Sequence, residues 1–136
     1  MNLEPLLTAP LAVQVHVATV TPAFAIGSWQ IFASRKGAPA HRTLGYLYLA
    51  LMTVTAISAL FIHSLMPKGP FGGFSPIHLF VIGTLVGVVN ALGAARTHNT
   101  AAHRGAMLGV YVGGILIAGS LAFLPGRIMH AVVFGG

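Results

Sequence analysis

The chain has 136 residues, of which 56% are hydrophobic and only 6% are charged, whereas a soluble domain is about a quarter charged; this composition indicates a single membrane domain. The absence of Cys excludes disulfides and thiolate sites, and a lone acidic residue, Glu4, excludes paired-carboxylate hydrolysis and carboxylate metal sites. The net charge of +6 does not indicate a nucleic-acid partner, because the basic residues lie at the ends of apolar runs.

The first half of the chain predicts a helical hairpin. A first helix is expected over about Leu11 to Ala33, and no Lys or Arg precedes it as a cleaved signal peptide would require. Residues Ser34 to Thr43 form a basic turn that is short enough to join only adjacent antiparallel helices. The second helix is expected over about Leu44 to Leu65, so hairpin one covers residues 11–65.

The second half predicts another hairpin, over residues 75–124. A segment rich in Pro and Gly, Met66 to Ser75, separates it from the first. Ser75-Pro76 is a helix start, and the third helix is expected to reach Ala95. A second basic turn, Arg96 to Gly105, leads to a fourth helix over about Ala106 to Leu124. The apolar tail, residues 125–136, is expected at the membrane interface.

Each of the four apolar runs is close to the roughly 20 residues that cross a bilayer. We therefore predict an all-α, integral membrane four-helix up-down bundle, formed by one domain over residues 1–136. Lys and Arg residues concentrate in the two basic turns, and such turns face the cytoplasm. The turns hold Arg35, Lys36, Arg42, Arg96 and Arg104, and the other end holds Lys68 and Arg127. Both termini are therefore expected on the outer side of the membrane, which is the periplasmic side if the membrane is the bacterial inner membrane that the family resemblance described below implies.

The two hairpins also share a sequence signature. His41-Arg42 opens one apolar run and His103-Arg104 opens another, 62 positions later, from 41 to 103. The same spacing relates His16 to His78. This pattern indicates a tandem repeat, in which two parallel hairpins are related by a pseudo-two-fold axis along the membrane normal.

Such an axis predicts two histidine pairs, one in each leaflet. His16 is expected to face His78, and His41 is expected to face His103. Two neutral imidazoles facing each other across a helical bundle are suited to axial ligation of haem iron. We therefore expect one or two haem b groups, with the pairs roughly 20 Å apart along the normal.

The same residues also have a simpler interpretation. Histidines in the first turn of a membrane helix can be interfacial anchors or caps, and Arg42 and Arg104 can be anchors that follow the positive-inside rule. If haem binds, these two arginines are expected to pair with its propionates or with anionic lipid. Arg127 could serve propionates in the outer leaflet in the same way.

The segments around both His-Arg pairs, together with Phe74-Ser75-Pro76-Ile77-His78 and Arg127, resemble a widespread bacterial family of small four-helix inner-membrane proteins of unknown function. The resemblance extends over nearly the whole chain from about His16. It implies a four-helix fold in the cytoplasmic membrane. Six residues of this chain occupy the signature positions of the family, as the resemblance implies: His16, His41, Arg42, His103, Arg104 and Arg127. The arrangement is also similar in outline to transmembrane di-haem cytochromes b.

Three functions remain open from the sequence. The first is a haem-b protein that carries electrons across or along the membrane. The second is a non-catalytic accessory subunit that packs against a larger respiratory or photosynthetic membrane complex. The expected partners are membrane lipid and either such a complex or further copies of the same chain. The third is a small-solute transporter, which parallel repeats permit but which usually has broken helices and a buried acidic residue. No hydrolytic or transferase site is visible, since no nucleophile–base pair occurs.

Overall fold

A computed structural model describes residues 1–62 and 76–135, and every regular element within these two ranges is helical. Four helical segments are long and apolar enough to cross a membrane. They are α2 (Leu11–Phe32), α3 (Pro39–Leu60), α4 (Pro76–Arg96) and a composite fourth segment made of α5 (Thr100–Gly109), η1 (Val110–Ile117) and α6 (Ala118–Leu121). The predicted all-α fold with four membrane-spanning helices is confirmed.

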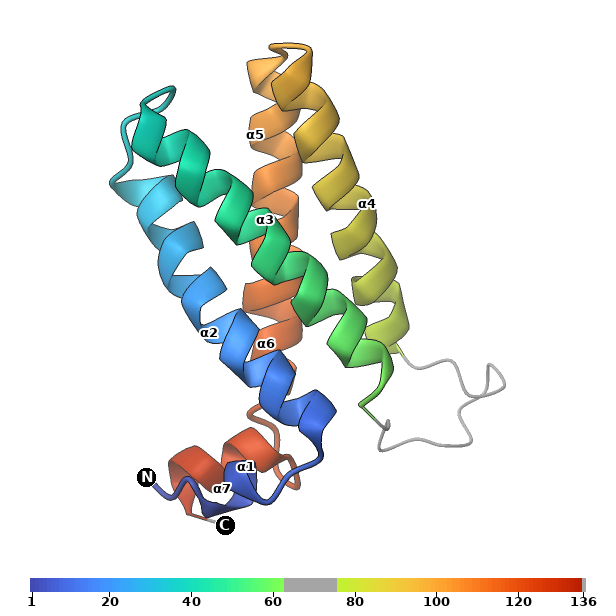
Figure 1. Cartoon of the computed structure of the whole chain (residues 1–136). Helices are drawn as coiled ribbons and strands as arrows, with labels where there is room; N and C mark the ends of the chain where they lie inside the picture. Colours follow the sequence, from blue (N-terminus) through green and yellow to red (C-terminus); the bar gives the residue numbers. More distant parts are fainter. Residues whose placement is uncertain (63–75, 136) are drawn as a thin grey trace.

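The helices are arranged as two antiparallel hairpins (Figure 1). Helix α2 packs along α3, and α4 packs along α5 and η1. The hairpins meet where α3 packs against α4 and, over a smaller contact, where η1 touches α2. The two basic turns lie apart at one end of the bundle, whereas α3 and α4 come together toward the other end (Figure 1).

Two of the predicted helix starts are wrong. Helix α3 begins at Pro39 rather than Leu44, since Pro at the first helical position has its φ angle already set and needs no amide partner. Helix α5 begins at Thr100 rather than Ala106, because the side chain of Asn99 accepts a hydrogen bond from the backbone N–H of Ala102 at 3.1 Å. Both His-Arg pairs therefore lie within the first five residues of their helices.

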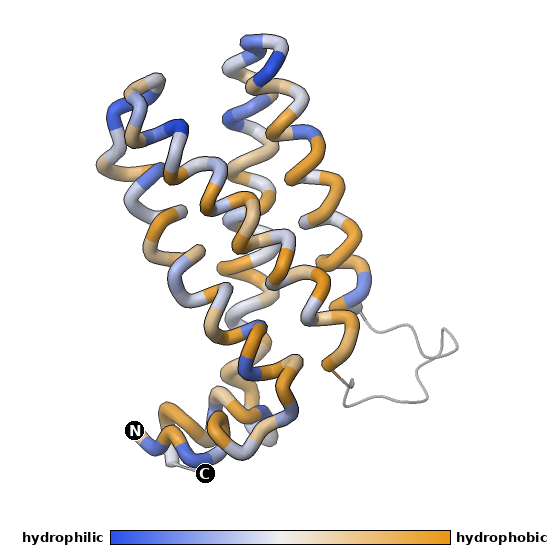
Figure 2. Tube along the Cα trace, viewed as in Figure 1, coloured by the Kyte–Doolittle hydropathy of each residue, from blue (hydrophilic) through white to orange (hydrophobic). Residues whose placement is uncertain are grey.

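The core of the bundle is small and mostly aliphatic, with the buried tyrosines Tyr48 and Tyr111 among its members. Its most deeply buried members are Ala23 of α2, Tyr48 and Met52 of α3, Ala91 of α4 and Val110 of η1. Outward-facing apolar side chains remain uncovered: Phe32 is 80% exposed and Leu79 is 74% exposed. In water this surface would be unfavourable, so it is consistent with lipid contact. Apolar residues dominate the middle of the bundle, and hydrophilic residues gather at the two basic turns (Figure 2).

Two short helices lie across the end of the bundle opposite the basic turns (Figure 1). Helix α1 (Glu4–Leu7) packs against α7 (Ile128–Phe134), and the backbone N–H of Asn2 donates to Val132 O at 3.0 Å. The tail is thus helical and folds back toward the amino terminus. The predicted separating loop at 66–75, the end of hairpin one at Leu65 and the predicted cap Ser75 fall outside the described residues.

Candidate functional site

Two of the predicted ligands, His41 and His103, lie at the basic-turn end of the bundle, one on each hairpin. Both occupy the first turn of their helix, and both are half-buried. They are close enough to interact electrostatically, and Lys36 of the first basic turn acts on His41 in the same way. The structure therefore places both histidines at the same end of the bundle, and their direct facing stays a prediction.

The ring of His103 is held by its own hairpin. Its Nδ1 lies 2.9 Å from the backbone O of Ala91 on α4. A carbonyl oxygen can only accept, so Nδ1 carries the proton and the neutral ring has its lone pair on Nε2. Nε2 of His103 has no hydrogen bond to any of the described residues.

His41 is held by different partners. Its Nδ1 lies 2.8 Å from the hydroxyl oxygen of Ser34, which can donate or accept. The side-chain amide of Gln30 donates to the backbone O of His41 at 2.8 Å. The Lys36 ammonium donates to the backbone O of Gln30. These contacts bind the end of α2, the basic turn and the start of α3 into one unit, which fixes the position of His41.

His16 lies near the opposite end, in the contact between α2 and α3. Its Nδ1 is 3.0 Å from Thr55 O and 3.2 Å from the Ser58 hydroxyl oxygen. Ser58 itself donates to Thr55 O at 2.8 Å, so the Ser58 oxygen is available to accept. Nδ1 of His16 is therefore the protonated nitrogen, and its lone pair also lies on Nε2.

His78 occupies the first turn of α4 and is half-buried. One turn further on, Val81 packs against Ala56 and Ala59 of α3. His16 and His78 thus lie near the same end of α3, on different neighbouring helices. Their direct facing across the bundle stays a prediction.

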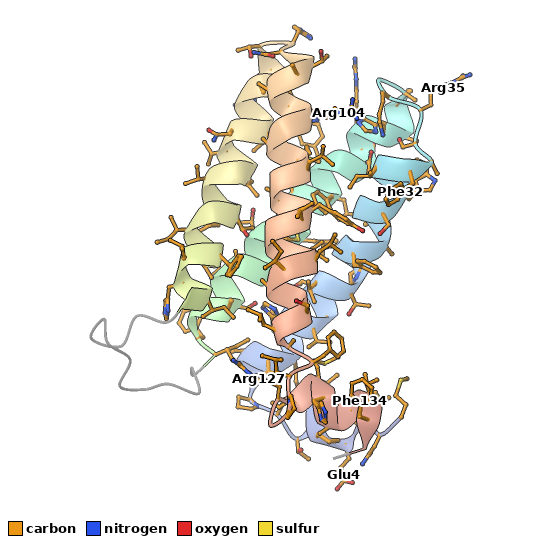
Figure 3. All side chains as sticks on the ribbon, turned by 180° about the vertical axis from the view of Figure 1, so that it is seen from behind. Glu4, Phe32, Arg35, Arg104, Arg127 and Phe134 are labelled. Carbon is orange, nitrogen blue, oxygen red and sulfur yellow. The ribbon has the colours of Figure 1, made fainter. Side chains whose placement is uncertain are left out.

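The three predicted arginines divide between the two ends (Figure 3). Arg104 lies at the basic-turn end with Arg35, and Arg127 lies at the end that carries Glu4. Arg42 and Arg104 are exposed, and Arg127 is half-buried immediately before α7. Arg42 directly follows His41 in the chain, and Arg104 directly follows His103. Both arginines therefore lie at the same end of the bundle as the two histidines.

The chemistry open to these residues is that of imidazole pairs. No group of three or more His, Cys, Asp or Glu side chains gathers within residues 1–62 and 76–135. A bare transition-metal ion usually needs three or four protein ligands. A porphyrin already supplies four nitrogens and needs only one or two imidazoles. Haem ligation by His41 and His103 stays a prediction from the sequence.

The polar residues that support the histidines were not found from the sequence. The side chains of Gln30 and Ser34 hold His41, whereas the backbone carbonyls of Thr55 and Ala91 hold His16 and His103. Gln30 could have been recognised from the sequence, because a polar amide in an apolar membrane helix needs a hydrogen-bond partner. The basic turn that carries His41 begins only a few residues later. A backbone carbonyl has no sequence signal at all.

Comparison with curated proteins of known description gives no match, and comparison with solved structures gives none. A protein family does match, over residues 13–133, and its description is that of a predicted membrane protein, DUF2306. The match includes both hairpins and all the histidines discussed above. With nearly the whole chain covered, the protein belongs to this family of membrane proteins of unknown function.

Proposed function

We propose that the protein binds haem b between its two hairpins and carries electrons in a bacterial inner membrane. The observation that supports this proposal best is the state of the His41 and His103 pair. The two rings come from different hairpins, interact electrostatically, and each uses Nδ1 for a hydrogen bond within the protein. The carbonyl of Ala91 leaves His103 with its lone pair on Nε2 for an iron, and His41 presents the same lone pair when its Nδ1 donates to the Ser34 hydroxyl.

The hydrogen bonds at Nδ1 are those that a ligating histidine needs. A ligating imidazole usually donates its other N–H to a carbonyl or carboxylate, which fixes the tautomer and raises the basicity of the ligating nitrogen. His103 does so through Ala91 O and His16 through Thr55 O. Bound haem would supply one-electron chemistry, and the chain would orient it, shield it from water and set its potential.

Positive charge also surrounds the proposed site. Arg42, Arg104 and Lys36 lie at the basic-turn end, where two propionates would reach the headgroup level. Guanidinium groups bind carboxylates in a bidentate manner. A second haem is proposed for His16 and His78, with Arg127 as the partner of its propionates at the other end.

The test is a visible spectrum of the full-length protein, purified in detergent after expression in haem-replete cells. We expect a Soret band and α and β bands that sharpen on reduction with dithionite, and a pyridine haemochrome assay gives the number of haems. His41→Ala and His103→Ala should each remove or shift the absorption of the same haem. His98→Ala is the matched control, since His98 is exposed in the second basic turn and should leave the spectrum unchanged.

A colourless protein with a native fold would overturn the haem proposal. One observation then favours the accessory-subunit alternative. An apolar groove of about 430 Å³ runs between α4 and the fourth segment, and glycines line both sides. They are Gly83, Gly87, Gly109 and Gly113. Small residues at this spacing let membrane helices approach closely. Co-purification of a larger membrane complex at fixed stoichiometry, without colour, would support this alternative.

A further inference from the structure

Two buried polar atoms in the contact between α2 and α3 have no hydrogen-bond partner among the described residues. They are the side-chain oxygen of Gln30, Oε1, and the hydroxyl of Tyr48. Gln30 is only 4% exposed and Tyr48 only 1% exposed. An unsatisfied polar group in an apolar interior costs about 1–3 kcal/mol, so each of the two atoms is expected to have a partner.

The orientation of the Gln30 amide is fixed. Its other terminal atom, Nε2, lies 2.8 Å from the backbone O of His41. That carbonyl can only accept, so the atom facing it must be the NH₂ group. Rotating the amide would bring two oxygens together. Oε1 is therefore an acceptor that requires a donor.

The Tyr48 hydroxyl lies in the same part of the contact. Gln30 Nε2 is 3.8 Å from the position that a Cβ would take at Gly45, one turn before Tyr48 on the same face of α3. The Tyr48 ring in turn touches Gly27, one turn before Gln30 on α2, since a Cβ there would lie 2.8 Å from its Cε2. Helical side chains lean toward the start of their own helix, so the phenol leans from residue 48 toward Gly45 and the amide.

We propose that a water molecule is bound in this contact, where it accepts from the Tyr48 hydroxyl and donates to Gln30 Oε1. Water suits these two groups because one molecule can donate to the amide oxygen and accept from the phenol at the same time. Tyr48 belongs to a buried apolar cluster that also contains Ala23, Leu49 and Met52. Internal waters of this kind bridge two to four polar groups and are costly to remove.

The water would also support His41. It holds Gln30 Oε1, and the same amide holds the His41 backbone through Nε2. Loss of the water would leave Gln30 Oε1 without a donor and would weaken the support that this side chain gives to the start of α3. The proposal concerns only side chains of this chain, and it stands whether or not haem binds.

Tyr48→Phe tests the proposal through the sign of its effect. If the hydroxyl binds water, its removal breaks the bridge, and the unfolding equilibrium constant in detergent should rise roughly tenfold. If the hydroxyl is truly unpaired, its removal should stabilise the protein or leave it unchanged, which would overturn the proposal. Tyr46→Phe is the matched control, because Tyr46 is 61% exposed and its substitution should have little effect.

A direct measurement gives the second criterion. In a high-resolution crystal structure of the full chain, we expect a water peak within hydrogen-bonding distance of both Gln30 Oε1 and the Tyr48 hydroxyl, and its disappearance in the Tyr48→Phe variant. Clear density for both side chains with no such peak would contradict the proposal. Because this readout does not depend on unfolding, it also covers the case of a variant that folds poorly.

Discussion

Gly27 allows two tyrosines from different hairpins to reach the backbone of α2. A Cβ at this position would lie 2.8 Å from Tyr48 Cε2 and 2.9 Å from Tyr111 Cδ2. Tyr111 is further held by the Ser28 hydroxyl at 2.7 Å and stacks on Phe24 with a centroid distance of 6.3 Å. Rings packed in this way cannot retreat without disturbing the rest of the core.

Gly27→Ala should therefore destabilise the bundle. Overpacking a well-filled core by one carbon typically costs about 1–3 kcal/mol, more than the roughly 0.5–1 kcal/mol that Gly→Ala gains in a helix. The measurement is the free energy of unfolding in detergent. Gly93→Ala is the control, because nothing lies within 4 Å of the Cβ position at Gly93. Equal effects of the two substitutions would show that the contact with the tyrosines is not tight.

At the residue scale, the sequence identified the histidines but not their surroundings. The 62-residue spacing was enough to predict that His41 and His103 lie at the same end of the bundle, because two parallel hairpins place equivalent positions at the same depth. The partners of their rings depend on rotamers and on backbone carbonyls, and these are decided by tertiary packing. The contrast between Ser34 for His41 and Ala91 O for His103 could not be read from a repeat.

At the scale of elements, the fourth segment differs from the regular helix that its hydropathy suggested. Residues Val110–Ile117 form a π-helix, η1, in which Val110, Tyr111 and Ile115 are buried. The wider turn brings two consecutive side chains inward, so Val110 packs against Gly87 while Tyr111 packs against Gly27. Hydropathy averages over this change, and therefore the segment was predicted correctly as a span but not in its helical geometry.

The π-helix also permits a close contact with both hairpins at Gly114. A Cβ there would lie 2.9 Å from Met52 Cε on α3 and 2.9 Å from Thr84 Oγ1 on α4. The Met52 methyl can move aside, but Thr84 is β-branched and buried, so its rotamer is restricted. The contact at Thr84 is thus the one that limits what residue 114 can be.

Gly114→Ala should lower the free energy of unfolding by about 1–2 kcal/mol through this contact. The adjacent Gly113→Ala is an unusually close control, since no atom lies within 4 Å of the Cβ position at Gly113. Thr84→Ala combined with Gly114→Ala should recover part of the lost stability. If the double variant recovers none of the stability lost in Gly114→Ala, the strain does not arise from the contact with Thr84.

The errors in helix boundaries have one cause. The apolar runs begin at Leu44 and Ala106, whereas the helices begin at Pro39 and Thr100. Hydropathy marks where lipid contact begins, but a helix starts where its first amides are satisfied or absent. Pro39 and Asn99 are the residues that start these helices, and both can be recognised in the sequence. Each helix begins there even though the residues that follow are polar.

For the whole molecule, the charge distribution predicts how the bundle sits in the membrane. Both basic turns lie at one end, and both termini lie at the other with α1 and α7 (Figures 1 and 3). Arg35, Lys36 and Arg96 lie at the turn end, and Arg127 lies at the opposite end. Positive residues near helix ends are retained in the cytoplasm, so we expect the turns inside the cell and both termini in the periplasm.

The chain has no Cys, so single cysteines report this orientation without a background. Thr8→Cys follows α1, and Thr97→Cys lies in the second basic turn; both positions are exposed. In intact cells whose outer membrane has been permeabilised, a thiol reagent that cannot cross the inner membrane should label residue 8 and not residue 97. Inverted inner-membrane vesicles should give the reverse. Labelling of residue 97 in the intact cells would reverse the proposed orientation and would place the His41 and His103 pair at the periplasmic face.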